Sequence, residues 1–97
     1  MTPNVTDIRK PAMAAKNGGA DGVAAINTIL CCSGVNMDTL RPEPTVEGYS
    51  TFGGYSYFGA KPIALRMVAQ IAQDVPGITI SGIGGMESLR KKKFLLT

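Results

Sequence analysis

The sequence contains no histidine and no tryptophan, and only 6% of its residues are aromatic. Without histidine the chain cannot form a Ser–His–Asp or Cys–His arrangement, and it lacks the commonest metal ligand. Its two cysteines, Cys31 and Cys32, are adjacent, so no C-x-x-C pair is available for a zinc site or an iron–sulfur cluster. We therefore expect no metal site, no catalytic thiol and a reduced, cytoplasmic setting.

Long apolar runs are also missing, and the charges over most of the chain are balanced. No apolar run approaches the length of a membrane span, and the polar first residues do not resemble a secretory signal. Residues 1–85 contain six basic and six acidic side chains, which cancel, so the net charge of +3 comes from residues 86–97. We expect no association with a membrane.

The basic end of the chain, which contains Arg90, Lys91, Lys92 and Lys93, is one candidate binding feature. Four cations could contact the phosphates of a nucleic acid, but only Phe94 follows them to stack on a base. Consecutive cations more often form a solvated segment. We expect no nucleic-acid partner, and a small nucleic-acid-binding protein is kept as an alternative function.

Two segments have the apolar spacing of helices. The first runs from the cap candidates Asn4 and Thr6 to a stop at residues 18–19, and the second is KPIALRMVAQIAQDVPG (61–77), with Pro62 in its first turn. Their expected apolar faces comprise Ile8, Ala12, Met13 and Ala15 in the first helix, and Ile63, Leu65, Met67, Val68, Ile71 and Ala72 in the second.

Two short segments have the composition of buried strands. DGVAAINT (21–28) is apolar until Asn27 and Thr28, and ITISGIGG (78–85) continues into a glycine turn. The alternation of helices and strands predicts an α/β fold with parallel strands, and residues 29–60, which have no clean period, predict an ordered lid or ligand loop. Because two parallel strands do not make a complete sheet, the sequence indicates a segment of a larger α/β domain.

The ends of both strands carry the candidate chemistry. Asn27 and Thr28 lie where ligands bind in parallel α/β sheets, and an asparagine offers both a donor and an acceptor to a planar heterocycle. On the residues alone, an asparagine that caps a turn is the simpler interpretation. The turn SGIGG (81–85) leaves backbone N–H groups accessible to a phosphate, although glycines after a strand more often form a plain turn.

The combination of TPNVTDI, ADGVAAINT, GGYS, KPIALRMVAQIA and ISGIGG closely resembles the flavin-containing barrel of dihydropyrimidine dehydrogenases, in the dihydroorotate dehydrogenase-like superfamily. The resemblance covers residues 2–85. It implies a segment of a (β/α)₈ TIM barrel, of about strands six to seven with flanking helices. It divides the chain into a partial FMN-binding barrel domain (1–85) and a divergent basic end (86–97).

The resemblance also implies a function. The family is FMN-dependent and reduces the 5,6 double bond of uracil or thymine, or catalyses the reverse oxidation, in pyrimidine catabolism. Its electrons come from NAD(P)H through iron–sulfur clusters and a flavoprotein electron-transfer subunit, and the parent enzyme is expected to be oligomeric. By position, Asn27 and Thr28 match the pair that binds the pyrimidine, which favours the ligand interpretation over the cap. The phosphate-binding turn of the family corresponds to Ile83, Gly84 and Gly85. A second segment that contacts the flavin corresponds to Ser56 and Tyr57.

The chain departs from the family pattern in several places. Tyr57 stands where the family has a glycine that contacts the flavin, and no lysine precedes the motif at residues 2–4. Neither Cys31 nor Cys32 matches the catalytic cysteine of the family, so we expect no catalytic residue in this chain. The isolated chain is expected to be an inactive fragment that binds FMN weakly or not at all, and a non-catalytic truncated product is the main alternative.

Overall fold

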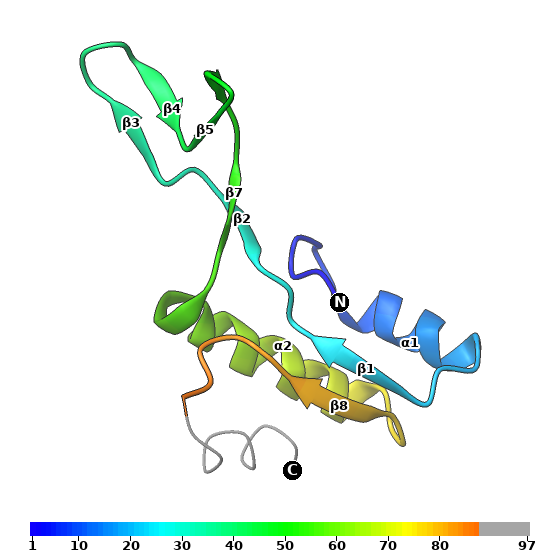
Figure 1. Cartoon of the computed structure of the whole chain (residues 1–97). Helices are drawn as coiled ribbons and strands as arrows, with labels where there is room; N and C mark the ends of the chain where they lie inside the picture. Colours follow the sequence, from blue (N-terminus) through cyan, green and yellow to red (C-terminus); the bar gives the residue numbers. More distant parts are fainter. Residues whose placement is uncertain (88–97) are drawn as a thin grey trace.

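The chain folds into an α/β body from which a long β arm projects, as Figure 1 shows. The computed structural model describes residues 1–87. The body contains helices α1 (Arg9–Asn17) and α2 (Lys61–Asp74) and strands β1 (Gly22–Ala25) and β8 (Thr79–Gly82). The α/β fold class is thereby confirmed. Every sheet formed by the described residues has two strands, so they close no barrel.

Strands β1 and β8 pair in parallel, as the sequence predicts, in a register that runs from Gly22 opposite Thr79 to Ala25 opposite Gly82. The pairing continues one residue further, because the Ile83 N–H donates to the Ala25 carbonyl at 2.6 Å and the Ile26 N–H donates to the Ile83 carbonyl at 3.0 Å. Both strands therefore end at the same edge of the sheet.

The core lies between the β1–β8 sheet and the two helices. Helix α2 presents small and branched apolar side chains to it, and the strands and α1 complete the cluster, which comprises Ile8, Ala12, Ala25, Ile26, Ala64, Met67, Val68, Ile71, Val75 and Ile80. The sequence placed Met13, Ile63 and Ala72 on the buried apolar faces of the helices, and this prediction was wrong, because all three are exposed. Since α2 packs on a narrow sheet, only one stripe of the helix is covered.

The predicted caps of the first helix, Asn4 and Thr6, were wrong, because the helix starts later, as the position of Pro11 allows. Helix α1 begins at Arg9, and the Arg9 N–H donates to Asp7 Oδ1 at 3.1 Å. Asn4 does not cap the helix, because its side chain bonds to residues that follow β1. The helix stop is confirmed, since α1 ends at Asn17 and Gly19 follows with φ of 93°.

Residues 29–55 form a β arm, where the sequence predicted a loop. The arm consists of three two-stranded antiparallel ladders. These pair β2 (Ile29–Cys31) with β7 (Gly53–Tyr55), β3 (Gly34–Asn36) with β4 (Arg41–Glu43), and β5 (Thr45–Val46) with β6 (Tyr49–Ser50). Most of its side chains are exposed on both faces, so burial imposes no alternation on the sequence.

The arm makes the molecule elongated. The principal extents are 52 × 31 × 20 Å and the radius of gyration is 16.0 Å, whereas a compact domain of this length would have a radius of about 13 Å. A short 3₁₀ helix, η1 (Tyr57–Ala60), returns the chain from the arm to α2.

Two further sequence predictions concern the basic end of the chain and membrane-spanning segments. Arg90, Lys91, Lys92 and Lys93, and with them most of the predicted basic end, lie outside the described residues. Over residues 1–87, no helix is long and apolar enough to cross a membrane.

Candidate functional site

All seven residues that the sequence singles out line two hollows at the edge where β1 and β8 end. The larger hollow has a volume of about 600 Å³ and is lined by Ser56, Tyr57, Ser81, Gly82, Ile83, Gly84, Gly85 and Met86. The smaller has about 100 Å³ and is lined by Ile26, Asn27, Thr28, Tyr55, Ser56, Ala60, Ile83 and Gly84. Because the two share Ser56, Ile83 and Gly84, they adjoin one another.

The glycine turn after β8 forms one wall of the larger hollow. Gly84 and Gly85 have φ of 121° and 72°, a region that side chains rarely adopt. A Cβ on Gly84 would lie 2.8 Å from the Ala64 Cβ, and one on Gly85 would lie 2.6 Å from the Lys61 Cβ. The turn therefore packs directly on the first turns of α2, and only glycine fits at either position.

The turn offers two backbone donors. Among the described residues, the N–H groups of Gly84 and Gly85 have no acceptor. The Ile83 N–H is already bonded to the Ala25 carbonyl at 2.6 Å, so Ile83 anchors the turn to β1 and cannot donate to a ligand as well. Two adjacent free amides suit an anion such as a phosphate.

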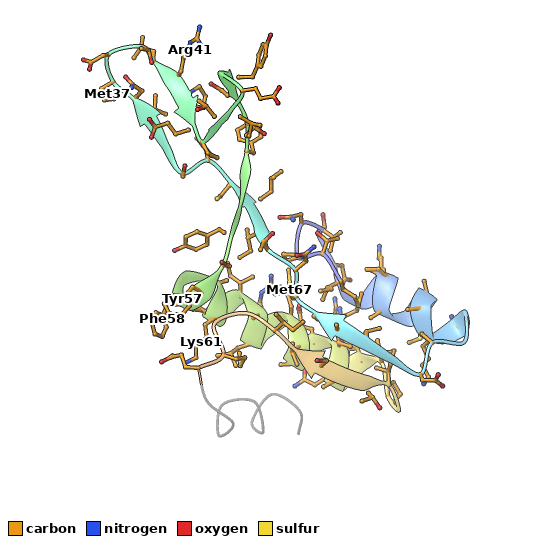
Figure 2. All side chains as sticks on the ribbon, viewed as in Figure 1. Met37, Arg41, Tyr57, Phe58, Lys61 and Met67 are labelled. Atoms are coloured by element: carbon orange, nitrogen blue, oxygen red, sulfur yellow. The ribbon has the colours of Figure 1, made fainter. Side chains whose placement is uncertain are left out.

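Ser56 and Tyr57 form the facing wall, where the arm returns to the body. Ser56 has an extended backbone, whereas Tyr57 has φ of 67°, in the left-handed region that favours glycine. The Tyr57 ring lies 4.2 Å from that of Phe58, and Figure 2 shows both beside Lys61 at the start of α2. A Cβ on Gly85 would lie 2.8 Å from the Tyr57 carbonyl oxygen, so the two walls nearly touch.

Asn27 and Thr28 line the smaller hollow, and both are exposed. The Asn27 Oδ1 accepts the Thr28 N–H at 2.8 Å, a local bond of the kind expected for a turn cap. The Asn27 Nδ2 and the Thr28 Oγ1 have no hydrogen-bond partner among residues 1–87. The Asn27 side chain therefore makes a local bond of the kind expected for a cap. The Asn27 Nδ2 and the Thr28 hydroxyl stay free to bind a ligand.

The structure adds residues that the sequence patterns did not single out. Ser81 brings a second hydroxyl to the larger hollow, and Tyr55 and Ala60 line the smaller one. Ser81 lies within the SGIGG segment, but its position in a strand gave no sign that its side chain faces a ligand site. Tyr55 is placed by the arm, which the sequence did not predict.

None of the described residues that line the two hollows is a carboxylate, a lysine, an arginine, a histidine or a cysteine. These residues can therefore bind and orient a ligand through amides and hydroxyls. Cys31 and Cys32 lie elsewhere, in a shallow depression on the arm with Leu30 and Phe52. Within residues 1–87, no group of three or more metal-ligating side chains is present.

The sequence was compared with families and with curated proteins. The model of the family described as dihydroorotate dehydrogenase matches residues 1–91. The chain belongs to the dihydroorotate dehydrogenase family. The family prediction made from the motifs is thereby confirmed, and enzymes of this family are FMN-dependent oxidoreductases.

Relatives with two different activities match the chain. It is 53% identical over 93 residues to the chloroplastic dihydropyrimidine dehydrogenase (NADP⁺) of Arabidopsis thaliana, and these residues cover 91% of this chain and 22% of that protein. It is 44% identical over 90 residues to a subunit of the NAD-dependent dihydropyrimidine dehydrogenase of Escherichia coli, with the same shares covered. It is 46% identical over 97 residues to the catalytic subunit of dihydroorotate dehydrogenase B of Pyrococcus horikoshii, covering 99% of this chain and 30% of that protein.

The chain thus spans between 22% and 30% of the length of these relatives. Membership of the dihydroorotate dehydrogenase family therefore describes one segment of a longer catalytic domain. The aligned segment contains both hollows.

Proposed function

We propose that the chain supplies the flavin-phosphate turn and the pyrimidine-binding pair of an FMN-dependent oxidoreductase. The enzyme reduces the 5,6 double bond of uracil or thymine with electrons from NAD(P)H, or catalyses the reverse oxidation, in pyrimidine catabolism. The observation that carries the proposal is the pair of adjoining hollows, which bring Asn27 and Thr28 beside the free amides of Gly84 and Gly85.

The larger hollow fits the phosphate of FMN. It combines two free backbone amides with the hydroxyls of Ser56 and Ser81, and the turn that carries the amides is fixed by its close packing on α2. These donors bind an anion without a cationic side chain. When bound, FMN supplies the hydride chemistry. Tyr57 narrows this wall of the hollow, so we expect its ring to weaken the hold on the phosphate.

The smaller hollow fits the edge of a pyrimidine. The Asn27 Nδ2 donates to a ring carbonyl, and the Thr28 hydroxyl can donate or accept at the neighbouring position. These contacts orient the ring and hold it against the flavin site. We assign proton transfer to the ring to a residue outside this chain, because the described residues that line the hollows include no histidine, carboxylate, amine or thiol.

The nature of the smaller hollow supports an uncharged pyrimidine over dihydroorotate. A dihydroorotate carboxylate would favour a cationic partner, and none of the residues 1–87 that line the hollow is a lysine or an arginine. The two dihydropyrimidine dehydrogenases among the relatives support the same choice. Dihydroorotate remains the second candidate substrate, because the Pyrococcus relative is 46% identical to the chain.

The remaining parts of the enzyme are proposed to come from other segments or chains. The E. coli relative is named as a subunit, and we propose that a flavoprotein subunit with iron–sulfur clusters delivers the electrons to an oligomeric enzyme. The described residues leave one edge of β8 unpaired, and residues 1–4 cover only the end of the outer edge of β1, which supports further barrel strands beside both. A reducing, cytoplasmic location is consistent with the free thiols of Cys31 and Cys32.

A chimera tests this function. Residues 1–87 would replace the aligned segment of the Arabidopsis enzyme, and the same residues would replace that of the Pyrococcus subunit. We expect the first chimera to retain FMN and to reduce uracil with NADPH, and the second to lose most of its dihydroorotate oxidation. Retained dihydroorotate oxidation in the second, with no uracil reduction in the first, would favour the dihydroorotate assignment.

A further inference from the structure

We propose that Asn4 is a positioning residue that holds Thr28 in place for the pyrimidine. This inference rests on the proposed function and adds a residue outside both hollows. The Asn4 Oδ1 accepts the Leu30 N–H at 2.9 Å, and the Asn4 Nδ2 donates to the Thr28 carbonyl at 3.2 Å. One side chain therefore bonds to the backbone on both sides of Ile29.

The bonds of Asn4 extend a longer contact between the first residues and the exit of β1. The Met1 ammonium donates to the Ala24 carbonyl, and the Asn27 N–H donates to the Met1 carbonyl at 2.8 Å. Residues 1–4 thus lie along residues 24–30, on a side of β1 that β8 does not occupy. Asn4 makes the last of these contacts, where β1 has ended and the arm begins.

Asn4 is itself held in place. Its Nδ2 and its backbone N–H both donate to the Thr2 Oγ1, each at 3.1 Å. The amide plane is therefore oriented before it reaches the residues after β1. At neutral pH an asparagine carries a donor and an acceptor on one short planar group, which matches this gap, whereas an aspartate would be ionised and could only accept.

The opposite side of Thr28 is held by the arm. Leu30 pairs with Gly54 in the β2–β7 ladder, and a Cβ on Gly54 would lie 2.6 Å from the Thr28 Cβ and overlap its Oγ1. The Thr28 side chain therefore packs directly on the backbone of β7. Thr28 is thus confined between the Asn4 amide and Gly54.

This arrangement has a consequence for the site. The arm is attached to the body through β2 and β7, and its side chains are largely exposed, so movement of the arm would displace Thr28 directly. The two bonds from Asn4 fix the junction at its base. We infer that they keep the Thr28 hydroxyl and the Asn27 amide at the distance that one pyrimidine edge requires.

Nuclear magnetic resonance on the ¹⁵N-labelled 97-residue chain tests the proposal, with uracil as the ligand. The signals to follow are the Asn27 side-chain amide and the Thr28 backbone amide during the titration, and hydrogen exchange at the Leu30 amide without ligand. We expect uracil to shift both signals in the unsubstituted chain. Asn4→Ala should weaken uracil binding by about 3- to 10-fold, as the loss of one or two hydrogen bonds implies, and should speed exchange at Leu30.

Asn36→Ala is the matched control. The Asn36 Oδ1 accepts the N–H groups of Asp38 and Thr39, each at 3.0 Å, in a turn of the arm far from either hollow. This variant also removes one asparagine that bonds to the backbone of an exposed segment. We expect its uracil affinity to equal that of the unsubstituted chain.

Asn4→Asp gives a readout that a general loss of structure would not produce. An ionised aspartate can accept from Leu30 but cannot donate to Thr28, whereas a protonated one can do both. Uracil affinity of Asn4→Asp, relative to the unsubstituted chain at the same pH, should therefore recover as the pH falls through about 4. Asn4→Ala should show no such recovery.

The outcomes separate this inference from the proposed function. Uracil shifts that are equal in the unsubstituted chain and in both Asn4 variants would overturn the role of Asn4 and leave the proposed function standing. No uracil shift in the unsubstituted chain would overturn the positioning role even if exchange at Leu30 changed, whereas the proposed function is decided independently by the chimeras. If Asn4→Ala does not fold, the pH dependence of Asn4→Asp decides.

Discussion

At the candidate site, Gly84 and Gly85 occupy positions that only glycine fits. Both have positive φ, and a Cβ on either would meet the backbone or the first side chains of α2 within 3 Å. Tyr57, on the facing wall, also has positive φ, at an expected cost of about 1–2 kcal/mol for a residue with a side chain. The walls of the larger hollow are therefore built from unusual backbone conformations, which position amides rather than side chains.

Gly84→Ala should destabilise the turn and displace its two amides, which should weaken anion binding. Strain at φ of 121° should cost about 1–3 kcal/mol, and the added methyl group would collide with Ala64. Urea denaturation of the chain would measure the loss of stability, and phosphate titration followed by NMR would measure the loss of binding at Gly85.

Gly19→Ala is the control for this substitution. Gly19 has φ of 93°, but a Cβ there meets no atom of the described residues within 4 Å. It should share the backbone strain and leave phosphate binding unchanged. Equal phosphate affinity in Gly84→Ala and in the unsubstituted chain would contradict the assignment of the turn as an anion site.

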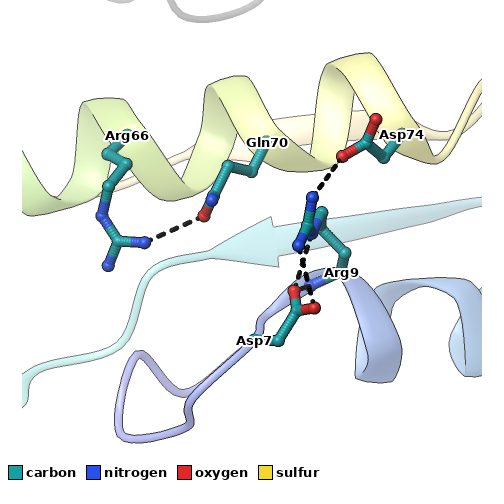
Figure 3. A network of polar contacts seen from close by, with 5 residues as sticks. All are labelled: Asp7, Arg9, Arg66, Gln70 and Asp74. Atoms are coloured by element: carbon teal, nitrogen blue, oxygen red, sulfur yellow. Dashed lines mark hydrogen bonds and ion pairs between the residues drawn. The ribbon is translucent and has the colours of Figure 1, made fainter.

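At the scale of elements, an ion-pair network joins the segment before α1 to the far end of α2. Arg9 bonds to Asp7 through Nε at 2.8 Å and to Asp74 through Nη1 at 2.8 Å, as Figure 3 shows. The hydrogen bond from Arg9 lowers the pKa of Asp7 below its usual value, and the same contacts raise the pKa of Arg9. The network fixes the two helices relative to one another around the Ile8 and Ile71 side chains.

Asp7→Asn should therefore destabilise the chain in a pH-dependent manner. Because the folded-state pKa of Asp7 is depressed, its contribution is present above the unfolded pKa, near 3.8, and is lost as the pH falls through the folded value. The stability difference between Asp7→Asn and the unsubstituted chain should be largest near pH 7 and should shrink below pH 3.8. The Arg9–Asp74 pair is exposed and the Arg9–Asp7 pair is half-buried at the surface, so the effect is expected to be small and sensitive to salt.

Thermal denaturation at a series of pH values would measure this effect. Arg66→Ala serves as a comparison, because among residues 1–87 Arg66 bonds only to Gln70, at 3.0 Å within α2, and connects no second element. A pH-independent difference for Asp7→Asn would show that Asp7 acts without its charge, as a simple acceptor for the Arg9 N–H.

At the scale of the whole molecule, the chain has one well-packed helix–sheet layer and a large exposed surface. Its sheet has two strands, its arm projects from the body, and its length is 22% to 30% of that of its relatives. Exposed apolar side chains are concentrated on the arm and include Leu30, Val35, Met37, Leu40, Val46, Tyr49 and Phe52. Such a surface is expected to be covered by other protein segments.

The isolated chain should consequently bind FMN weakly or not at all. The phosphate turn is present, but the hollows have walls from only two strands and the arm base, so most of a flavin ring would face water. Absorbance near the flavin band after purification and gel filtration with added FMN would measure the stoichiometry. Stoichiometric yellow protein that reduces uracil with NAD(P)H would contradict this expectation.

The sequence alone predicts the elements that have one buried face, and the turns in which glycine adopts positive φ. The 3.6-residue spacing in 61–77 predicts α2 because one face must be buried, and DGVAAINT predicts a strand that ends in polar residues. The glycines of ISGIGG predict a turn because glycine adopts positive φ without the steric cost that a side chain imposes. These signals are local, and the ordered set of motifs was specific enough to indicate the family.

The sequence did not predict the arm, the start of α1 or the partners of Asn4, because these depend on tertiary contacts. Strands β2 to β7 bury little, so no periodicity marks them, and their ladders come from backbone pairing between residues up to 26 positions apart. Asn4 has the sequence signature of a helix cap, but it bonds to Thr28 and Leu30, because residues 1–4 lie beside the exit of β1. Whether a residue caps a helix depends on the local chain geometry. The two bonds of Asn4 depend instead on which distant segment packs next to residues 1–4.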